Sequence, residues 1–396
     1  MASGLQPSAQ VLDEVIDLRR YLHRRPEVSF EEHETSRFLE AQLEALGAAV
    51  FPCPTETGAV AGLDTGRPGR TVMLRADIDA LPIQEESGLE FASAREGRMH
   101  ACGHDAHTAI LLGTVRTLVE HAESLCGSFL FCFQPAEEVV SGARAMIARG
   151  LFERHRPDVT LGLHVAAWLP SGTVVTRPGL LWAGSDGFEI VMRGPGGHGG
   201  LMGRAGNVIS AQAFLLERLE TVVEGLEHEG SGCRCTVGDV RSDGAWNVVP
   251  RSLVVRGSLR TFTPELREEA LSRLRGLLLE VDSEFQVASD LRLVHHTVPL
   301  HNHPDVTRVV LEVGRELIGD RAGTVGAPLT VSDDMAEFLT RIPGCYFMLG
   351  AWPPGAETPP AHHSPSFRID EAALATGVRM LAGAAARLAL PAPPPG

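Results

Sequence analysis

The pattern of apolar and polar positions predicts alternating helices and strands in the first half of the chain. The segments with apolar residues at helical spacing are 8–25, 31–46 and 106–121. Pro26 separates the first two segments, and Gly47 gives a stop signal after the second. Short apolar runs, which we expect to be buried strands, occupy 71–74, 128–133 and 159–163. This alternation is typical of an open α/β sheet.

Each of these apolar runs leads into polar residues. The first is followed by 75–79 (RADID), the second by 134–138 (QPAEE), and the third by His164. In open α/β sheets, functional side chains gather at the carboxyl ends of the strands. We therefore expect a site there, and we expect Asp105 to cap the helix over 106–121, with His104 just before it.

The pattern changes between 183 and 296. The expected strands are 188–191, a segment near 233–240 and 247–261, and the expected helices are 207–224 and 264–282. This βαββαβ-type order predicts an inserted α+β domain of ferredoxin-like type over 183–296, with two helices on one face of an antiparallel sheet. The catalytic domain is then 1–182 together with 297–396.

After the insertion, the earlier pattern returns. We expect a helix over 304–318, a strand over 345–349 and a closing helix over 370–389. The proline-rich end, 391–396, is expected to be disordered. A chain of 396 residues also exceeds the size at which a single core keeps growing, which independently favours two domains.

Charge and composition exclude several functions. The net charge is −15 with no basic stripe, so neither nucleic acid nor an anionic membrane surface is an expected partner. The chain contains no lysine, and all 35 basic residues are arginines. Schiff-base chemistry, pyridoxal phosphate attachment and a phosphate-loop lysine are therefore excluded.

The cysteines and the N-terminal segment predict a cytoplasmic protein. Seven cysteines, an odd number, are scattered through the chain, unlike the disulfide framework of a small secreted protein. The first fifteen residues show no targeting pattern, and no window has the length and apolarity of a membrane span.

Residues near the predicted strand ends and helix starts are of the types that bind borderline divalent metals. The candidate ligands are Cys102, His104, Glu138, His164 and His363. Thiolate and imidazole favour zinc and similar ions, whereas calcium or magnesium sites use oxygen alone. A catalytic zinc takes three protein ligands and keeps a position for water, so five ligands indicate two metals that share a water.

The neighbouring carboxylates Glu137 and Glu138 follow a predicted strand, where successive side chains point in opposite directions. One can then ligate metal while the other faces the bound water. Hydrolysis of an amide needs a general base beside such a water. We assign Glu137 as the base and Glu138 as the ligand.

Several motifs together resemble one family. They are 22–27 (LHRRPE), 75–83 (RADIDALPI), 100–105 (HACGHD), 134–138, His164, 196–198 (GGH), 247–250 (NVVP) and 363–365 (HSP). Nearly from end to end, the chain resembles the metal-dependent amidohydrolases that include hippurate hydrolase, N-acyl-amino-acid aminoacylases and the plant auxin-conjugate hydrolases. The resemblance implies a mixed-sheet catalytic domain like that of the dinuclear metallopeptidases.

The resemblance also implies roles for individual residues. It assigns metal ligation to the five candidates named above, general acid and base chemistry to Glu137, and support of the site to Asp79. It implies that the inserted domain is a lid and a dimer contact, giving a homodimer or a dimer-based tetramer. His198 is then expected to reach the partner's site and stabilise the oxyanion.

Two further positions match substrate contacts of the family, Asn247 and Arg260. An arginine fork suits the free carboxylate of an N-acyl amino acid, although Arg260 could equally form a structural ion pair. The sequence departs from the family pattern in the lid loop 199–208 and at 331–335, where VSDDM stands in place of Gly-Ser-Glu-Asp-Phe. These departures predict a looser lid loop and an altered substrate range.

The leading hypothesis is metal-dependent hydrolysis of the amide in N-acyl amino acids such as acetyl or benzoyl derivatives, releasing a carboxylic acid and a free amino acid. Zinc is the first expectation for the two ions, followed by manganese, cobalt and nickel. A metallocarboxypeptidase or dipeptidase would use the same chemistry. Two hypotheses of a different kind are a thiol hydrolase with Cys102 as nucleophile and a non-catalytic ligand-binding homologue.

Overall fold

The computed structural model describes residues 5–391, which form two compact units. Unit 1 comprises the described residues up to 179, with 301–326 and 334–391, and unit 2 comprises 180–300 and 327–333. The tail expected to be disordered lies outside the described residues except for residue 391. No helix among the described residues is long and apolar enough to cross a membrane.

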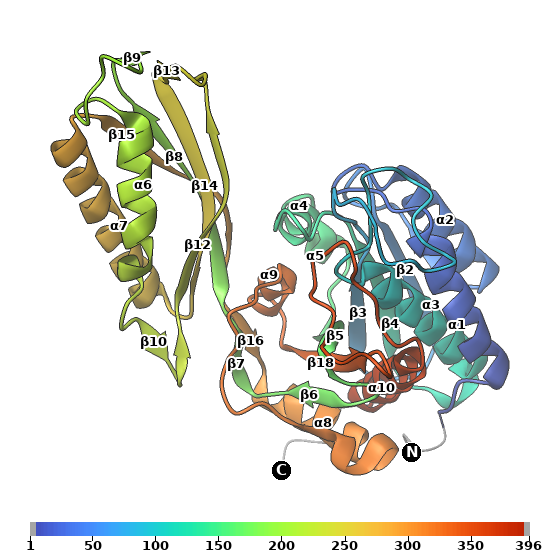
Figure 1. The fold of residues 1–396 in the computed structure, drawn as a ribbon. Coiled ribbons are helices and arrows are strands. Elements are labelled where there is room, and N and C mark those ends of the chain that lie inside the picture. The colour runs from blue at the N-terminus through green and yellow to red at the C-terminus, as the bar shows by residue number, and fades with distance from the viewer. Residues whose placement is uncertain (1–4, 392–396) are drawn as a thin grey trace. The chain divides into compact units, whose positions relative to one another are not determined.

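Unit 1 is built on an eight-stranded mixed sheet in the order β1-β2-β4-β3-β5-β18-β6-β17 (Figure 1). Its strands are β1 (Ala49–Phe51), β2 (Ala59–Asp64), β3 (Thr71–Asp77), β4 (Ser128–Gln134), β5 (Val159–Pro170), β6 (Val174–Thr176), β17 (Ala322–Thr324) and β18 (Gly344–Trp352). The central strands β4, β3, β5 and β18 are mutually parallel, whereas β1, β2 and β6 supply antiparallel pairings. The expected α/β fold with a mixed sheet is confirmed.

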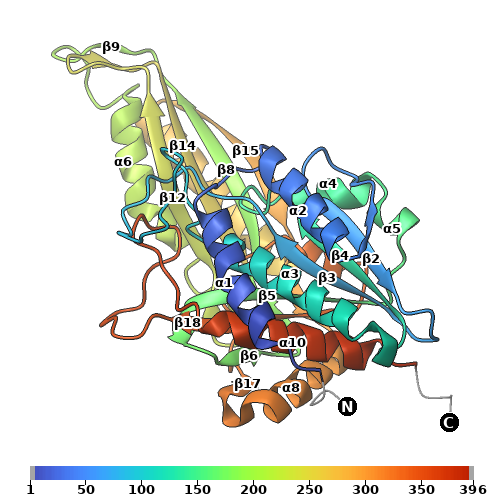
Figure 2. The ribbon, with the colours of Figure 1, turned by 90° about the vertical axis from the view of Figure 1, so that its right-hand side faces the viewer.

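Helices cover this sheet and bury most of its apolar surface. They are α1 (Ala9–His23), α2 (His33–Ala45), α3 (His104–Glu120), α4 (Gly142–Ala148), α5 (Leu151–Arg154), α8 (Pro304–Ile318), α9 (Met335–Leu339) and α10 (Ala373–Leu388). Figure 2 shows α1, α3 and α10 side by side, in agreement with their direct contacts. Nearly every side chain of α3 is buried, because this helix lies between the sheet and its neighbours.

Unit 2 contains a four-stranded antiparallel sheet in the order β12-β14-β8-β15. The strands are β8 (Gly184–Arg193), β12 (Arg234–Ser242), β14 (Ser252–Thr261) and β15 (Ala288–Thr297). Two helices, α6 (Val208–Arg218) and α7 (Pro264–Phe285), pack on one face of the sheet (Figure 1) and enclose a separate apolar core. Along the chain the order is therefore β8-α6-β12-β14-α7-β15.

Three local expectations need correction. Asp105 does not cap α3, because the helix begins at His104 and its N-cap is Gly103. Asp105 instead lies in the first turn, where Arg19 Nε donates to it at 2.8 Å. His164 lies within β5 rather than after it, since that strand continues to Pro170. The helix expected over 207–224 ends at Arg218 and continues as a 3₁₀ turn to Val222.

Candidate metal centre

Strand register places the two acidic segments beside each other. In the parallel pair β3 and β4, Asp77 lies opposite Gln134, so both strands end at the same level of the sheet. The residues that follow, Asp79 on one side and the 137–138 pair on the other, therefore leave the same edge. His164 belongs to β5, the other parallel neighbour of β3, two residues beyond the partner of Arg75.

A glycine brings the cysteine loop onto β5. Gly103 has a φ of 94°, in the left-handed region, and a Cβ added there would lie 2.3 Å from Cγ2 of Val165. Only glycine fits this close approach without displacement. Because Val165 follows His164, the same contact holds Cys102 next to His164, with Sγ 3.4 Å from Nε2.

Asp79 connects the ligand candidates. Its Oδ1 lies 3.2 Å from Nδ1 of His104, and its two oxygens accept the backbone N–H groups of Glu137 and Glu138 at 3.1 and 3.0 Å. The hydroxyl of Ser29 donates to Oδ2 at 2.7 Å. The backbone carbonyl of Asp79 lies closer still to Nδ1 of His104, at 2.9 Å. Both oxygens hold the imidazole at Nδ1 and leave Nε2 directed at the site, which is the usual support for a metal-binding histidine.

A second carboxylate, Asp77, has a similar role on the opposite side. Its Oδ1 lies 2.6 Å from Nδ1 of His107, whose Nε2 accepts the backbone N–H of Val165 at 2.8 Å. His107 therefore links β3, α3 and β5. Asp77 Oδ2 accepts a hydrogen bond from Arg75 at 2.9 Å and lies 3.7 Å from His104 Nε2.

Three imidazole nitrogens surround the sulfur of Cys102. Besides His164, Nε2 of His363 lies 3.3 Å from Sγ, and Nδ1 of His362 lies 3.8 Å from it. His363 Nε2 is also 3.4 Å from Glu138 Oε2. The fifth predicted ligand, His104, has its Nε2 3.8 Å from Glu138 Oε1. These contacts therefore place all five predicted ligands in one cluster.

The spacing of these donor atoms suits metal ligation. Two ligands bound about 2.0–2.3 Å from one tetrahedral ion are roughly 3.3–3.7 Å apart, which is close to the distances just given. His104 Nε2 and Glu138 Oε1 are buried and make no hydrogen bond to any described residue. Buried polar atoms of this kind need a partner, and a divalent cation would satisfy both.

The donors also fall into overlapping groups of three. Cys102, His104 and His164 form one group, and Cys102, Glu138 and His363 form another. In each group the ligand atoms lie within 4.8 Å of one another. Because Cys102 belongs to both groups, two neighbouring ions could share its thiolate. The residues present therefore fit a two-metal centre.

The electrostatics of the cluster favour an added positive charge. Burial alone would lower the pKa of His104, but Asp77 and Asp79 raise it well above that of a free imidazole. Burial raises the pKa of Glu138 to about 8, and the charges of Asp79 and Asp77 act in the same direction. Burial, together with the charge of Glu138, raises the pKa of the Cys102 thiol well above its ordinary value.

Sequence reasoning missed several residues around the centre. His362 is the nearest of them, and burial lowers its pKa to about 3. Glu32 accepts the backbone N–H of Ala136 at 2.8 Å, and Ala136 has a φ of 55°, unusual for a residue with a side chain. Neither residue has a motif signal of its own, because its role depends on contacts between segments far apart in the sequence.

The predicted substrate residues lie in unit 2. His198 is in β9 (Gly197–His198), which pairs with β13 (Val248–Val249), so His198 lies opposite Val248 and near Asn247. The backbone N–H of Gly200 donates to His198 Nδ1 at 3.1 Å. Arg260 lies on β14, and its Nη1 donates to the hydroxyl of Ser332 at 2.8 Å.

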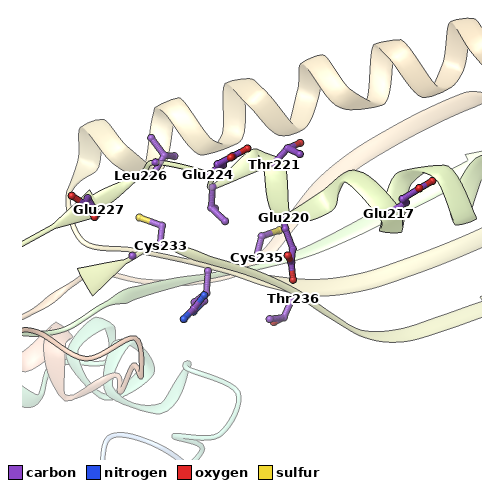
Figure 3. Close-up of a pocket in the computed structure, with 13 residues that line it drawn as sticks. Glu217, Glu220, Thr221, Glu224, Leu226, Glu227, Cys233, Cys235 and Thr236 are labelled. Atoms are coloured by element: carbon purple, nitrogen blue, oxygen red, sulfur yellow. The ribbon is translucent and has the colours of Figure 1, made fainter. Parts of the chain in front are cut away.

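Unit 2 also contains a pocket of about 740 Å³ between its helical layer and β12 (Figure 3). Its lining includes Glu220, Glu224, Cys233 and Cys235, and none of the predicted site residues. All seven cysteines of the chain are free thiols. The pocket therefore has no part in the cluster around Cys102.

The fold and the donor set together define the class of a metal-dependent hydrolase. The family model described as Peptidase family M20/M25/M40 matches residues 73–387. The chain belongs to this family, and its expected resemblance to dinuclear-metal amidohydrolases is confirmed.

Relatives of known name extend over nearly the whole chain. N-acetyl-L-cysteine deacetylase of Bacillus subtilis (strain 168) is 34% identical over 378 residues, covering 95% of this chain and 88% of that protein. IAA-amino acid hydrolase ILR1-like 2 of Arabidopsis thaliana is 33% identical over 384 residues, covering 96% of this chain and 86% of that protein. A crystal structure of a Bacillus subtilis protein described as a dinuclear metal binding peptidase is 29% identical, with a TM-score of 0.77 over 96% of this chain and 99% of the other.

Proposed function

We propose that this protein hydrolyses the amide bond of N-acyl amino acids, with two divalent ions held by Cys102, His104, Glu138, His164 and His363. The observation that carries the proposal is the donor cluster itself, in which two groups of three ligands share Cys102, one of them fully buried. The names of the two relatives, a deacetylase of an N-acetyl amino acid and a hydrolase of an amino acid conjugate, support the substrate class.

Glu137 is the proton carrier in this proposal. It lies beside the ligand Glu138 and is almost fully buried, with Oε2 3.9 Å from His104 Nε2. Bound ions of this kind polarise a carbonyl oxygen and lower the pKa of a water. Glu137 takes the proton of the attacking water and gives it to the leaving amine nitrogen, so that the amino acid departs as a neutral amine.

His198 has the tautomer needed to stabilise an oxyanion. Its Nδ1 accepts the N–H of Gly200, so a neutral ring carries its proton on Nε2. That N–H is the kind of donor that stabilises the oxygen of a tetrahedral intermediate. Arg260, and Asn247 beside His198, remain our candidates for binding the substrate carboxylate.

Unit 2 is proposed to act as the lid and as the contact that makes a homodimer or a dimer-based tetramer. Its sheet ends in two edge strands, β12 and β15, which can pair with another chain. Near β9 and β13, Leu201 is 86% exposed and Trp246 is 96% exposed. Large apolar side chains exposed near an open sheet are typical of an interface.

The dimer proposal predicts complementation between inactive variants. If His198 serves the partner's site, His198→Ala and Glu137→Ala are each inactive, whereas a mixed dimer contains one complete site. Mixing the two after reversible dissociation should restore activity to roughly a quarter of the wild-type level, as random pairing requires. Failure to restore activity in dimers shown to have exchanged subunits would place His198 within its own chain's site.

A metallocarboxypeptidase remains the second candidate, because the similar crystal structure is described as a peptidase. The last peptide bond of a short peptide is also an amide to a free amino acid. A panel of acetyl and benzoyl amino acids, compared with dipeptides, distinguishes the two candidates when assayed with zinc, manganese, cobalt and nickel. The proposal expects kcat/KM to be highest for the N-acyl amino acids.

The general base is tested by Glu137→Gln, which keeps the size of the side chain but cannot accept the proton. We expect kcat to fall by about 10²–10⁴-fold with the metal content unchanged. Glu123→Gln, at an exposed position in a 3₁₀ turn, is the matched control and should leave kcat unaltered. Substantial turnover by the Glu137→Gln variant, or wild-type turnover after complete chelation, would contradict the mechanism.

The structure argues against the thiol hydrolase. A nucleophilic cysteine needs a lowered pKa, whereas burial and Glu138 raise the pKa of Cys102. Alkylation that abolished activity while chelators had no effect would restore that hypothesis.

A further inference from the structure

We propose that His362 is a positioning residue that donates an N–H···S hydrogen bond to the Cys102 thiolate and is not a sixth metal ligand. This inference rests on the proposed function, because it requires Cys102 to bind metal. Its basis is the pair of contacts made by the two ring nitrogens of His362, one to a backbone amide and one to the sulfur.

The backbone fixes the tautomer of His362. The N–H of Ala167 donates to Nε2 of the ring at 3.2 Å, so Nε2 must present a lone pair. In a neutral imidazole the proton is then on Nδ1. Nδ1 is the atom that lies 3.8 Å from Cys102 Sγ, and its proton faces this sulfur as well as the backbone carbonyl of Cys102.

His164 shows the opposite arrangement at the same sulfur. Its Nδ1 lies 2.7 Å from the backbone carbonyl of Val165, which can only accept a hydrogen bond. The proton of His164 is thus on Nδ1, and Nε2 directs a lone pair toward the cluster, 3.4 Å from Cys102 Sγ. One imidazole is set to bind a cation, whereas the other is set to donate to the thiolate.

The surrounding rings hold His362 in this orientation. Its ring centroid is 4.6 Å from that of Phe367 and 4.9 Å from that of Trp168. Rotation of the ring by 180° would turn a carbon toward the Ala167 N–H and lose that hydrogen bond. If Nδ1 of His362 bound a metal, its proton would be on Nε2, and that N–H would face the N–H of Ala167. Donation to the sulfur is the arrangement that satisfies both contacts.

Hydrogen bonds to a coordinated sulfur remove electron density from it. The Cys102 thiolate then becomes a weaker base, which keeps it deprotonated at lower pH and less reactive toward alkylating agents. Such control is useful here, because the sulfur of Cys102 belongs to both groups of candidate ligands.

Cobalt-substituted protein tests the inference without an activity assay, because a thiolate bound to Co²⁺ gives a sulfur-to-metal charge-transfer band in the near ultraviolet. His362→Leu removes the donor and should move the band to longer wavelength while two cobalt ions per chain remain. Cobalt should also be released at a higher pH, and iodoacetamide should alkylate Cys102 severalfold faster. His362→Asn places an amide N–H near the position of Nδ1 and should restore most of the wild-type behaviour.

The matched control is His155→Leu, which removes a histidine that packs against Phe51 on β1 and should leave the band unchanged. Loss of one cobalt ion in His362→Leu would make His362 a ligand and overturn the inference. Identical spectra for wild type and both His362 variants would also overturn it. Absence of a sulfur-to-cobalt band in the wild type would refute Cys102 ligation itself, whereas a normal band with no amide hydrolysis would refute only the proposed substrate class.

Discussion

At the scale of single residues, Asp79 organises the centre without belonging to either Cys102-containing group. Its carboxylate accepts both backbone N–H groups of the Glu137–Glu138 pair and, with the Asp79 backbone carbonyl, contacts the ring of His104. We expect Asp79→Ala to lower kcat or metal affinity by about 10–100-fold, since partners that orient ligands have effects of this size. Metal analysis and steady-state kinetics measure the two effects separately.

Two comparisons sharpen that prediction. Ser29→Ala removes only the hydroxyl that donates to Asp79, so its effect should be smaller and in the same direction. Asp64→Ala changes an exposed aspartate at the end of β2 and should have no effect. Wild-type kinetics and metal content in Asp79→Ala would remove Asp79 from its supporting role.

Gly103 is the second residue whose effect can be isolated. Gly103→Ala combines a strained φ of 94° with a Cβ 2.3 Å from Val165, whereas Gly97→Ala has a φ of 68° and no atom within 4 Å. Left-handed strain costs about 1–3 kcal/mol, so both variants should lower the free energy of unfolding. Only Gly103→Ala should lower the free energy of unfolding by more than this strain, because its Cβ also displaces Val165. It should also bind metal poorly. Equal losses in urea titrations would show that contact with β5 is unimportant.

At the scale of elements, a buried carboxylate ties three parts of unit 2 together. Asp186 of β8 accepts two hydrogen bonds from Arg267 of α7, at 2.7 and 2.8 Å, and lies 3.1 Å from His296 Nδ1 of β15. Burial would raise the pKa of Asp186, but hydrogen bonds from His296 and Arg267 lower it below its ordinary value. The folded state therefore favours the carboxylate.

The sign of the pH dependence follows. The stabilisation is present above the unfolded-state pKa of about 3.9 and is lost as pH falls through the lower folded-state pKa. At pH 7, Asp186→Asn should reduce the free energy of unfolding by about 1.5–3 kcal/mol, the usual value of a charged hydrogen bond. Asp290→Asn, in an exposed pair with Arg292, is the control and should have little effect. A constant difference from wild type between pH 7 and pH 2.5 would contradict this assignment.

The same scale shows what the sequence could and could not predict. Apolar spacing located the central strands β3, β4, β5 and β18 and the long helices, because each buries one continuous surface, but it missed β1, β2, β6 and β17. The motifs identified all five ligand candidates. The strand register then places them close together. The sequence could not show that Asp105 pairs with Arg19 rather than capping α3, or that His362 faces Cys102. Those contacts join segments 86 and 260 residues apart, and no periodicity records them.

At the scale of the whole molecule, metal binding should be linked to protons and to stability. Without metal, the raised pKa values of Cys102 and Glu138, the latter about 8, keep both groups protonated at neutral pH. Ligation needs the thiolate and the carboxylate, so binding must release these protons. We therefore expect metal affinity to fall as pH decreases below about 8 and chelation to lower Tm.

Calorimetric titration of metal-free protein in buffers of different ionisation enthalpy measures the proton release directly. His104, whose pKa is also raised, must lose a proton to ligate through Nε2, so the expected release at pH 7 is between two and three protons per chain, decreasing above pH 8 as Glu138 ionises. Cys102→Ser should reduce the number by about one, because a serine hydroxyl does not ionise in this range. Binding with no proton release at pH 7 would contradict the assignment of these two groups as ligands.

The strand order of unit 1 also has a consequence for how the chain is made. β18 lies between β5 and β6 in the sheet, although most of unit 2 separates it from them in sequence. On the ribosome, most of unit 2 emerges while the sheet of unit 1 still lacks an inner strand. The ligand group of Cys102, Glu138 and His363 is complete only when His363, 261 residues after Cys102, has been synthesised. A nascent chain stalled before residue 344 should therefore leave β5 and β6 unjoined, and the group of Cys102, Glu138 and His363 can bind its ion only near the end of synthesis.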